Sequence, residues 1–359
     1  MTGRVKKISA VFREDLELIA QDDTLPWSEL SQSVVFITGA TGLIGSALVA
    51  ALAIANENRS LGLKIIAGGQ NRAKAEFLLS GYAPEIIIQD IREPLAFDGP
   101  VDYFFHCAAM TKSSEMVATP VDVIETSVLG TKNILALARE KQAKSLVYLS
   151  SMEVYGRMEG EVAESDLGYL DLSNPRTSYP ESKRLGESLG VAYAAQHGLP
   201  VKIARLGLTF GAGTPRDDSR VFAQFARSAM AGQNIELHTA GHSLANCCYT
   251  ADAILGLLTL LLKGVSGEAY NIANPGASLT IREMAELAAG EIGRSQIKVV
   301  LKIPDDIAQR GYAPEVRLKL DVSRLCALGW SPKYGLAEMY RRMMLDWNDA
   351  RLRDGEQRP

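Results

Sequence analysis

The chain has 359 residues, of which 47% are hydrophobic and 22% are charged, and its formal net charge is -4. This length is large for one domain and sufficient for two. The sequence has no basic stripe, so its weak negative charge gives no reason to expect nucleic acid or an anionic membrane as a partner. The longest apolar run, residues 253–262, is too short to span a bilayer and predicts a buried helix.

The cysteines and the N-terminus bear on the cellular compartment. Cys107, Cys247, Cys248 and Cys326 have neither the spacing of a metal site nor the density of a disulfide framework. Cys247 and Cys248 are adjacent, and we expect two reduced core residues rather than a strained vicinal disulfide. The first residues are basic but lack the apolar segment of a signal peptide. We therefore expect no bound metal and a protein of the reducing cytoplasm.

Residues 1–32 differ in pattern from the rest of the chain. The segment "VFREDLELIAQ", residues 11–21, has apolar side chains at helical spacing. The polar connector "DDTLPWSEL", residues 22–30, follows it. We predict an N-terminal helical arm that packs on the main body.

From residue 33 onward, strand and helix patterns alternate. Strands are predicted at 33–39, 63–69, 85–90, 101–109, 145–151 and 200–208, and helices at 42–56, 71–81, 121–142 and 179–198. This alternation predicts an α/β fold, a doubly wound parallel-sheet Rossmann domain over residues 33–207. Residues 246–274 are expected to return to this domain.

After residue 208 the alternation becomes irregular. Helices are predicted at 219–232, 279–293 and 334–352, with irregular segments between them. Helices at this end of a doubly wound sheet form the substrate side, so we predict a smaller, mainly substrate-binding domain over 208–350. The last residues, 351–359, are predicted to be a disordered tail.

A glycine-rich loop lies between the first strand and the first helix of the sheet. The segment "ITGATGLIG" contains Gly39, Gly42 and Gly45, with Thr41, Leu43 and Ile44 between them. Glycines here let the backbone approach a pyrophosphate, which then lies at the helix N-terminus. A tight helix–sheet contact could also require them, but the position directly after a strand favours a nucleotide.

The end of the second predicted strand lacks the acidic residue that would bond an adenosine ribose. Gly68, Gly69 and Gln70 occupy that place, and Arg72 lies close by. Arg72 could face a 2'-phosphate, stack on adenine, or be a solvated residue at the start of a helix. The residues leave the choice between NAD and NADP open.

The strand at 145–151 ends in polar residues. Ser150, Ser151 and Glu153 follow its apolar part, and a buried position would not accept them without partners. Tyr179 lies 28 residues after Ser151, and Lys183 lies four after Tyr179 on one helix face. We expect Lys183 to lower the pKa of the Tyr179 phenol.

The glycine loop, Ser151 and the Tyr-x-x-x-Lys pair, in this order, resemble the extended short-chain dehydrogenase/reductase family, the NAD-dependent epimerase/dehydratase group. The resemblance covers residues 33 to about 347 and includes "QDI", "HCAA", "SSMEVYG" and "GEAYNIAN". It implies that Ser151, Tyr179 and Lys183 are catalytic, with Tyr179 as general base. The implied cofactor contacts are Gly39, Thr41, Gly42, Leu43, Ile44, Gly45, Arg72, Asp90, Ile91, Cys107, Ala108, Ala109, Tyr179 and Lys183. Relatives pair their two long helices, so the resemblance also implies a homodimer.

The two residues after Ser151 narrow the reaction that the resemblance implies. Sugar 4,6-dehydratases commonly have Asp-Glu there, whereas this chain has Met152 and Glu153. Methionine cannot donate a proton, and "SSMEVYG" is most similar to the motif of UDP-glucuronate decarboxylases. We expect Glu153 to face the substrate as a catalytic residue; the alternative is a hydrogen bond to a neighbouring loop. The implied substrate contacts are Met110, Ser151, Met152, Glu153 and Arg220.

Three positions depart from the family pattern. Leu208 replaces an Asn that bonds the substrate diphosphate, and Ala245 replaces an Arg that grips phosphate or carboxylate. Ser127 replaces an Asn in a helix of the first domain.

The favoured interpretation is a redox-neutral enzyme, an epimerase or decarboxylase, that holds NAD and acts on a nucleotide-linked sugar through a transient keto-sugar. One alternative is an NADP-dependent reductase or dehydrogenase. Another is a cofactor-binding subunit without catalysis, against which the complete set of Ser151, Tyr179 and Lys183 argues.

Overall fold

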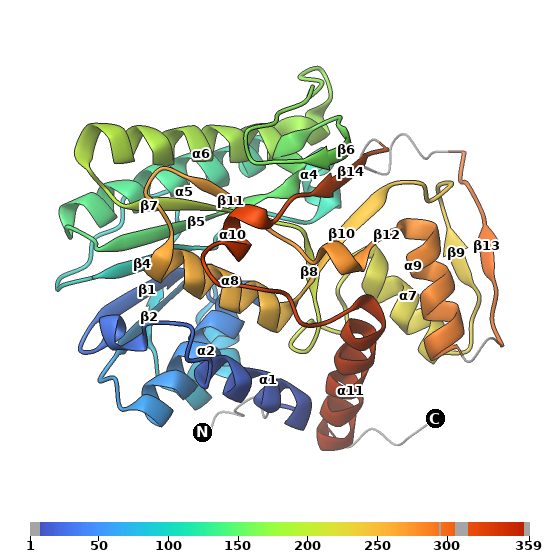
Figure 1. Ribbon diagram of the computed structural model, residues 1–359, viewed down its shortest axis with the longest axis horizontal. Helices are drawn as coiled ribbons and strands as arrows, with labels where there is room; N and C mark the ends of the chain where they lie inside the picture. The colour runs from blue at the N-terminus through green and yellow to red at the C-terminus, as the bar shows by residue number, and fades with distance from the viewer. Residues whose placement is uncertain (1–7, 294–295, 306–314, 355–359) are drawn as a thin grey trace.

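The centre of the molecule is a seven-stranded parallel sheet in the order β11–β7–β5–β4–β1–β2–β3 (Figure 1). The computed structural model describes residues 8–293, 296–305 and 315–354. The strands are β1 (Val34–Thr38), β2 (Lys64–Gly69), β3 (Glu85–Ile88), β4 (Tyr103–His106), β5 (Ser145–Ser151), β7 (Val201–Leu206) and β11 (Ala269–Ile272). The predicted doubly wound α/β fold is confirmed.

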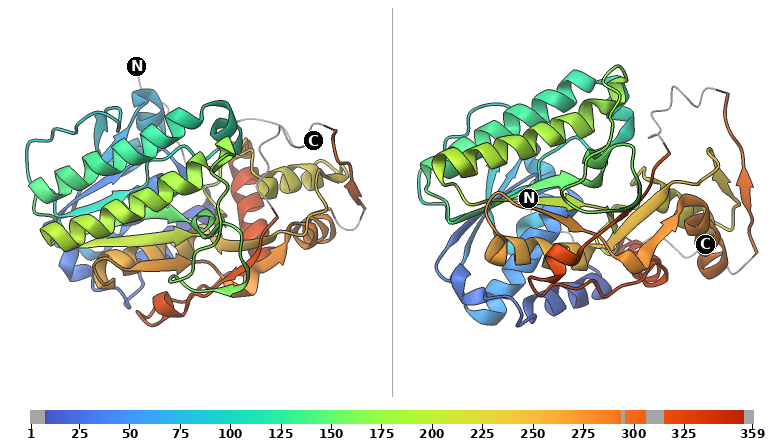
Figure 2. Two further views of the ribbon diagram at one scale, coloured as in Figure 1. Left: turned by 90° about the horizontal axis from the view of Figure 1, so that it is seen from above. Right: turned by 45° about the horizontal axis from the view of Figure 1, so that its top comes forward.

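Helices cover both faces of this sheet, as the near-continuous apolar strands require. Every residue of β1 is buried, which is typical of a parallel strand between two helical layers. One layer contains α4 (Ser113–Ala118), α5 (Pro120–Glu140) and α6 (Ser178–His197), and the other contains α2 (Leu43–Arg59), α3 (Arg72–Leu79) and α8 (Thr250–Lys263). Figure 2 shows α5 and α6 side by side along the outside of the first layer.

The connection from β7 leads into a second, smaller region. It contains α7 (Val221–Met230), α9 (Ile281–Leu287) and α11 (Leu336–Asp354), at the right of Figure 1. It also contains β8 (Leu208–Phe210), β10 (Leu244–Tyr249) and β12 (Ser278–Thr280), which form a three-stranded sheet. Two parallel pairs complete the strands: β9 (Ile235–Leu237) with β13 (Val299–Leu301), and β6 (Glu159–Val162) with β14 (Arg317–Leu320).

Apart from β6, these short strands correct our description of the chain after residue 208, where we had expected helices joined by irregular segments. A strand of three residues gives too little alternation to be recognised, and its pairing comes from distant segments. After residue 246, α8 packs against β5 and β7 of the large sheet, and β11 pairs with β7. The division into two domains remains a proposal.

The N-terminal arm is a helix, α1 (Ala10–Ala20), packed beside α2. Its Asp15 is buried and pairs with Arg342 of α11 at 2.5 Å. Tyr249, at the end of β10, also donates a hydrogen bond to Asp15. Through Asp15, the N-terminal helix α1 is therefore bonded to α11, the last described helix, and to the end of β10.

The C-terminal end differs in part from the expectation for residues 351–359. Helix α11 continues to Asp354, so residues 351–354 are helical rather than disordered. The remainder of that segment lies outside the described residues.

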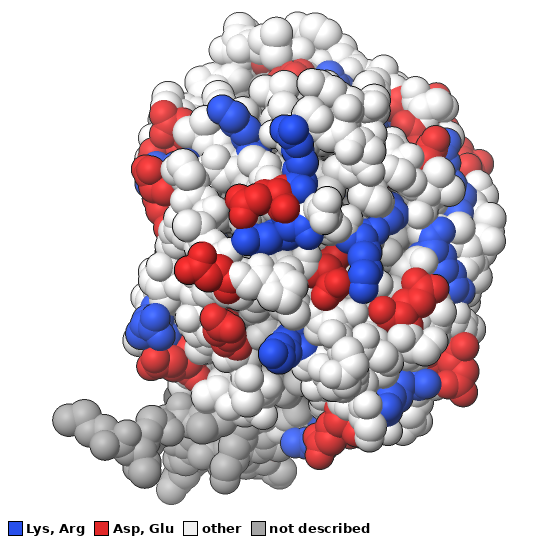
Figure 3. Space-filling model, turned by 90° about the vertical axis from the view of Figure 1, so that its left-hand side faces the viewer, with Lys and Arg blue, Asp and Glu red and all other residues white. Residues whose placement is uncertain are grey.

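The surface on the left-hand side of Figure 1 carries Lys and Arg interspersed with Asp and Glu (Figure 3). This face presents no extended area of one sign. Over the described part of the chain, none of the helices is both long and apolar enough to cross a membrane.

Candidate active site

The glycine loop forms a tightly packed cradle at the start of α2. Gly39 has a φ of 63°, and a Cβ on it would lie 2.7 Å from the backbone nitrogen of Ala108. A Cβ on Gly45 would lie 2.3 Å from the carbonyl oxygen of Gly39. Gly42 is the N-cap of α2 and offers no side chain to its free N–H groups. The backbone N–H groups here can therefore approach a bound anion closely, as binding of a pyrophosphate requires.

The neighbouring residues of the cradle differ in burial. Thr41 is half-buried, and its Cγ2 would lie 3.5 Å from a Cβ on Gly69 at the end of β2. Leu43 is half-buried, and Ile44 packs against the main core. The strand end and the loop therefore lie together, as their order in the chain led us to expect.

At the position of the missing ribose acid, Arg72 is the first residue of α3. Its side chain is 60% exposed and lies 3.6 Å from Glu76, one turn along the helix. This is the solvated helix-start residue that we gave as one of three interpretations. The neighbouring Asp90 pairs with Arg92 at 2.7 Å, and hydrogen bonds from Arg92 lower the pKa of the Asp90 carboxyl. Ile91 is buried.

The end of β4 contributes the next part of the site. His106 is buried between Thr38 and Thr131, at 2.8 and 3.2 Å from their hydroxyl oxygens. Burial lowers the pKa of His106 to about 3, so its ring is neutral. Cys107 follows, and burial raises the pKa of its thiol. The backbone N–H of Ala108 donates to the Thr38 hydroxyl, and Ala109 is partly exposed.

The structure brings Ser151, Tyr179 and Lys183 together at the end of β5. Ser151 is its last residue and is part-exposed, and Tyr179 lies in the first turn of α6. Lys183 is buried, and its ammonium group donates to the carbonyl of Leu149 at 2.6 Å. The same nitrogen lies 6.0 Å from the centre of the Tyr179 ring. Burial lowers the pKa of Lys183 to about 8.

The pKa of Tyr179 differs in direction from our expectation. Burial raises it above its ordinary value, and the negative charge of Glu153 raises it further. A hydrogen bond with Ser151 and the charges of Arg176 and Arg220 lower it by less. Burial and the Glu153 charge outweigh these contributions, so the net change in the pKa of Tyr179 is upward. In this structure burial therefore favours the protonated form of Tyr179.

Glu153 makes an ion pair with Arg176, the residue that begins the approach to α6. Two guanidinium nitrogens of Arg176 donate to the two carboxylate oxygens of Glu153, at 2.6 and 3.0 Å. The Arg176 side chain is 7% exposed and that of Glu153 is 31% exposed. This is the contact with a neighbouring loop that we gave as the alternative for Glu153. The Glu153 side chain stays partly exposed in this pair.

Beneath Ser151, a buried network supports the strand end. Ser150 donates to Glu187 of α6 at 2.5 Å, and Glu187 pairs with Arg205 of β7 at 2.7 Å. Arg205 also donates to the Tyr155 hydroxyl, which in turn donates to Asn271 of β11 at 2.6 Å.

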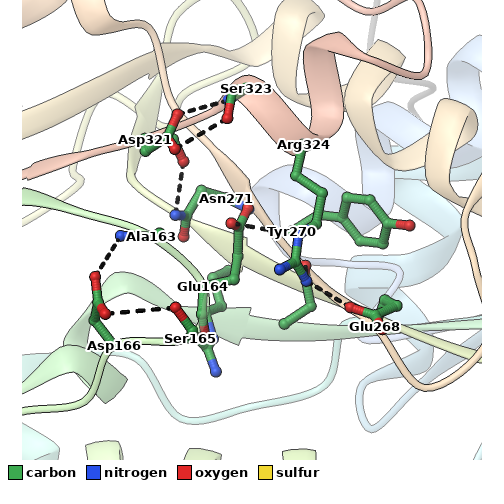
Figure 4. Close-up of polar contacts among 12 residues, drawn as sticks. Ala163, Glu164, Ser165, Asp166, Glu268, Tyr270, Asn271, Asp321, Ser323 and Arg324 are labelled. Atoms are coloured by element: carbon green, nitrogen blue, oxygen red, sulfur yellow. Dashed lines mark hydrogen bonds and ion pairs between the residues drawn. The ribbon is translucent and has the colours of Figure 1, made fainter.

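This network continues to the segment after β14. Asn271 donates to the carbonyl of Asp321, and its backbone N–H donates to the carboxylate of Glu164 (Figure 4). Arg324 lies 3.6 Å from Glu164 and 2.5 Å from Glu268. Because the polar groups satisfy one another, the strand end below the site is held by bonds to β7, β11 and α6.

The substrate side of the site is partly apolar. Met110 packs with Met116, Val123 and Tyr179, and Met152 packs against the main core. Arg220 precedes α7, pairs with Asp218 at 2.7 Å and is 37% exposed.

The positions that depart from the family pattern lie on the small sheet and on α5. Leu208 pairs with Cys247, and Ala245 is opposite Leu279 in the same sheet. Ala245 is buried, so no cationic side chain stands there or directly across from it. The hydroxyl of Ser127 is buried and has no hydrogen-bond partner among the described residues.

Three residues of the site were missed from the sequence. Glu187 and Arg205 lie in the predicted helix 179–198 and strand 200–208, and Arg176 lies just before that helix; none of them was singled out from the sequence. Their only signal is nearness to Tyr179 or to a strand end, which does not separate a buried ion pair from a solvated charge. Throughout the described residues, no group of three His, Cys, Asp or Glu side chains is placed to hold a metal ion.

Comparisons with known proteins agree with this geometry. The model of the NAD dependent epimerase/dehydratase family matches residues 35–273. UDP-glucuronic acid decarboxylase 5 of Arabidopsis thaliana is 34% identical over 326 residues, which cover 89% of this chain and 90% of the relative. The dTDP-glucose 4,6-dehydratase DesIV of Streptomyces venezuelae, solved with NAD bound, has a TM-score of 0.74 at 25% identity, covering 89% of this chain and 98% of that one.

A further solved structure shares the fold. UDP-glucose 4-epimerase of Thermotoga maritima has a TM-score of 0.72 at 21% identity and covers 90% of this chain and all of that one, 100%. The extent of these matches confirms the fold, the family and, at the level of the family, the dependence on NAD. The chain belongs to the NAD-dependent epimerase/dehydratase family.

Proposed function

We propose that the protein carries out a redox-neutral modification of a nucleotide-linked sugar, of the decarboxylase or epimerase type, through a transient keto-sugar. The observation that carries this proposal is the convergence of Ser151, Tyr179 and Lys183 at one strand end, beside the glycine cradle. The relatives named UDP-glucuronic acid decarboxylases, at 34% identity, support the class of substrate.

The chain's own groups fit the cofactor that the family uses. The cradle at Gly39 and Gly45 has no room for a Cβ, and the N-terminus of α2 favours negative charge. When bound, NAD accepts a hydride from the sugar and returns it. The residues Thr41, Leu43, Ile44, Ile91 and Cys107–Ala109 are proposed to line this cofactor.

Ser151 and Tyr179 are proposed to act on one sugar hydroxyl. The Ser151 oxygen accepts the backbone N–H of Glu153 at 3.2 Å, which holds the hydroxyl in place beside Tyr179. Tyr179 then takes the proton of the sugar hydroxyl as general base and returns it after the change at the sugar. Lys183, a buried cation held by Leu149, supplies positive charge near the phenolate.

Met152 and Glu153 favour decarboxylation or epimerisation over dehydration. Loss of a hydroxyl needs a proton donor near it, and Met152 cannot supply one. Oxidation at C4 makes the neighbouring position acidic or prepares loss of a carboxylate, and neither step needs that donor. We propose that Glu153, which is part-exposed and held by Arg176 through both of its oxygens, orients the sugar rather than transferring a proton.

The protein is proposed to act as a homodimer in the cytoplasm. The outer faces of α5 and α6 expose Val121, Ile124, Leu129 and Leu185, whose exposed fractions are 65, 44, 39 and 47%. Apolar side chains on two adjacent helices suit a four-helix interface with a second copy. The free cysteines agree with a reducing compartment.

The function is tested by incubating the protein and NAD with UDP-glucuronate, UDP-glucose and their GDP, CDP and dTDP counterparts. Products are followed by NMR. We expect release of carbon dioxide from a glucuronate, or inversion at C4 or C5, and both must be absent from Tyr179→Phe. A 4-keto-6-deoxy product would contradict the argument from Met152. Absence of reaction with all of these compounds would contradict the proposed substrate class. The apolar Leu208 and Ala245 would then indicate a substrate without the diphosphate that relatives bind at these positions.

A further inference from the structure

The ion pair between Arg176 and Glu153 joins the two segments that carry Ser151 and Tyr179. Glu153 lies in the 3₁₀ turn Met152–Tyr155, which follows directly on β5 and Ser151. Arg176 lies in the 3₁₀ turn Pro175–Thr177, which leads directly into α6 and Tyr179. Both guanidinium contacts, at 2.6 and 3.0 Å, run from one turn to the other. The two halves of the catalytic pair are therefore cross-linked within a few residues of the hydroxyls.

Each end of this link is fixed by its own backbone. The N–H of Glu153 donates to the Ser151 side chain, and the N–H of Arg176 donates to the Asn174 side chain at 3.0 Å. The guanidinium is almost fully buried, so water does not compete strongly for its hydrogen bonds. A two-bond contact with little exposure holds orientation better than a single surface ion pair does.

The pair also places balanced charge beside Tyr179. The Glu153 carboxylate raises the pKa of Tyr179, and the Arg176 guanidinium lowers it. Arg220 is the other cation that lowers it, and its own partner is Asp218. Loss of one member of the pair would leave the other member uncompensated next to the phenol.

We propose that Arg176 is a positioning residue that, through Glu153, fixes Tyr179 against Ser151 and balances the charge beside the phenol. This inference rests on the proposed roles of Ser151 and Tyr179. It assigns Glu153 to orientation rather than to proton transfer, because its two oxygens are already hydrogen-bond acceptors of one buried guanidinium.

The first test needs no substrate. The protein is labelled with ¹³C at tyrosine Cζ and titrated with NAD bound, and the Tyr179 resonance is identified by its loss in Tyr179→Phe. In Arg176→Met we expect Tyr179 to titrate about 1 pH unit or more above the wild type, and in Glu153→Gln below it. The double variant should titrate between the two single variants.

Two further variants keep this test decisive. Arg176→Lys keeps the positive charge but cannot make both hydrogen bonds, so Tyr179 should titrate nearer to its wild-type value in this variant. It also serves as the test variant if Arg176→Met does not fold. Arg317→Met removes a half-exposed arginine paired with Glu315, outside the network below Ser151, and should leave the Tyr179 titration unchanged. Equal Tyr179 titration in the wild type and in every Arg176 and Glu153 variant would overturn the proposal.

The second test uses turnover of whichever substrate the NMR screen identifies. Arg176→Met should lower kcat by about 10- to 100-fold, since small displacements of a reacting group have effects of this size. The double variant should be no worse than the poorer single variant, because both changes break one link. A double variant whose losses multiply would contradict the link. Should no substrate react, the proposed function fails alone, and the titration still decides the role of Arg176.

Discussion

A Cβ on Gly45 would lie 2.3 Å from the carbonyl oxygen of Gly39, so the first turn of α2 packs directly against the loop that precedes it. Gly45→Ala must displace backbone rather than the end of a flexible side chain, at a cost of about 1–3 kcal/mol. We expect a corresponding loss of NAD affinity, measured by titration calorimetry. Gly335→Ala is the control, because a Cβ there meets nothing within 4 Å. Unchanged NAD affinity in Gly45→Ala would remove the cradle from cofactor binding.

Tyr179→Phe keeps a ring of nearly the same shape in its cluster with Met116 and Val123 and removes only the hydroxyl. Turnover should fall by about 100- to 10,000-fold, the usual contribution of a general base. NAD affinity and thermal stability should stay close to those of the wild type. Tyr169→Phe, on an exposed tyrosine, serves as control. Activity within a few-fold of the wild type would exclude Tyr179 as the base.

Arg72 gives a prediction about cofactor preference. Its side chain is 60% exposed and lies near Glu76, and Gln70 carries no charge for a 2'-phosphate. We expect NAD to bind more tightly than NADP, and Arg72→Ala to leave the ratio of the two affinities almost unchanged. Calorimetry with both cofactors measures this. Tighter binding of NADP that disappears in Arg72→Ala would favour the reductase interpretation instead.

The proposed dimer can be broken at Ile124, which is 44% exposed on the outer face of α5. A charge there would be buried without a partner in a helical interface, so Ile124→Glu should sediment as a monomer at micromolar concentration. Val265→Glu, at an exposed valine after α8, should leave the dimer intact. A wild type that sediments as a monomer would contradict the dimer itself.

Lys202 is a buried lysine of β7, and burial lowers its pKa from 10.5 to about 8. Its ammonium group donates to Ser145 at 2.7 Å. Between these two pKa values the unfolded chain binds more protons than the folded one, so this group makes stability increase with pH, by at most about 1.4 kcal/mol per unit. Below about pH 8 it is charged in both states, and its desolvation cost is present in full.

The prediction follows by comparison with Lys202→Met. The free energy of unfolding of this variant, relative to that of the wild type, should be highest near pH 7 and should fall as the pH approaches about 10. Urea unfolding at a series of pH values measures the difference, with Lys302→Met, at a side chain 70% exposed, as control. A difference in unfolding free energy that does not vary with pH would show that Lys202 is not desolvated in the folded protein.

The local elements of the fold could be predicted from the sequence. Strand β5 ends at Ser151 as expected, because apolar β-branched and aromatic residues give way there to hydroxyls. The glycine loop was also recognisable, since a loop that lets backbone approach a ligand needs residues without a Cβ at fixed spacing. Ser151, Tyr179 and Lys183 could likewise be recognised from their residue types and their order along the chain.

Only the tertiary structure decided which charges meet. Arg176 and Glu153 are 23 positions apart, and Glu187 pairs with Arg205 across 18. Nothing in either segment separates a buried pair from two solvated side chains. The rise in the pKa of Tyr179 likewise depends on burial, which a motif does not contain. Spacing along the chain fixes the residues of the site, whereas the packing of distant segments fixes their solvation and their partners, and hence their electrostatics.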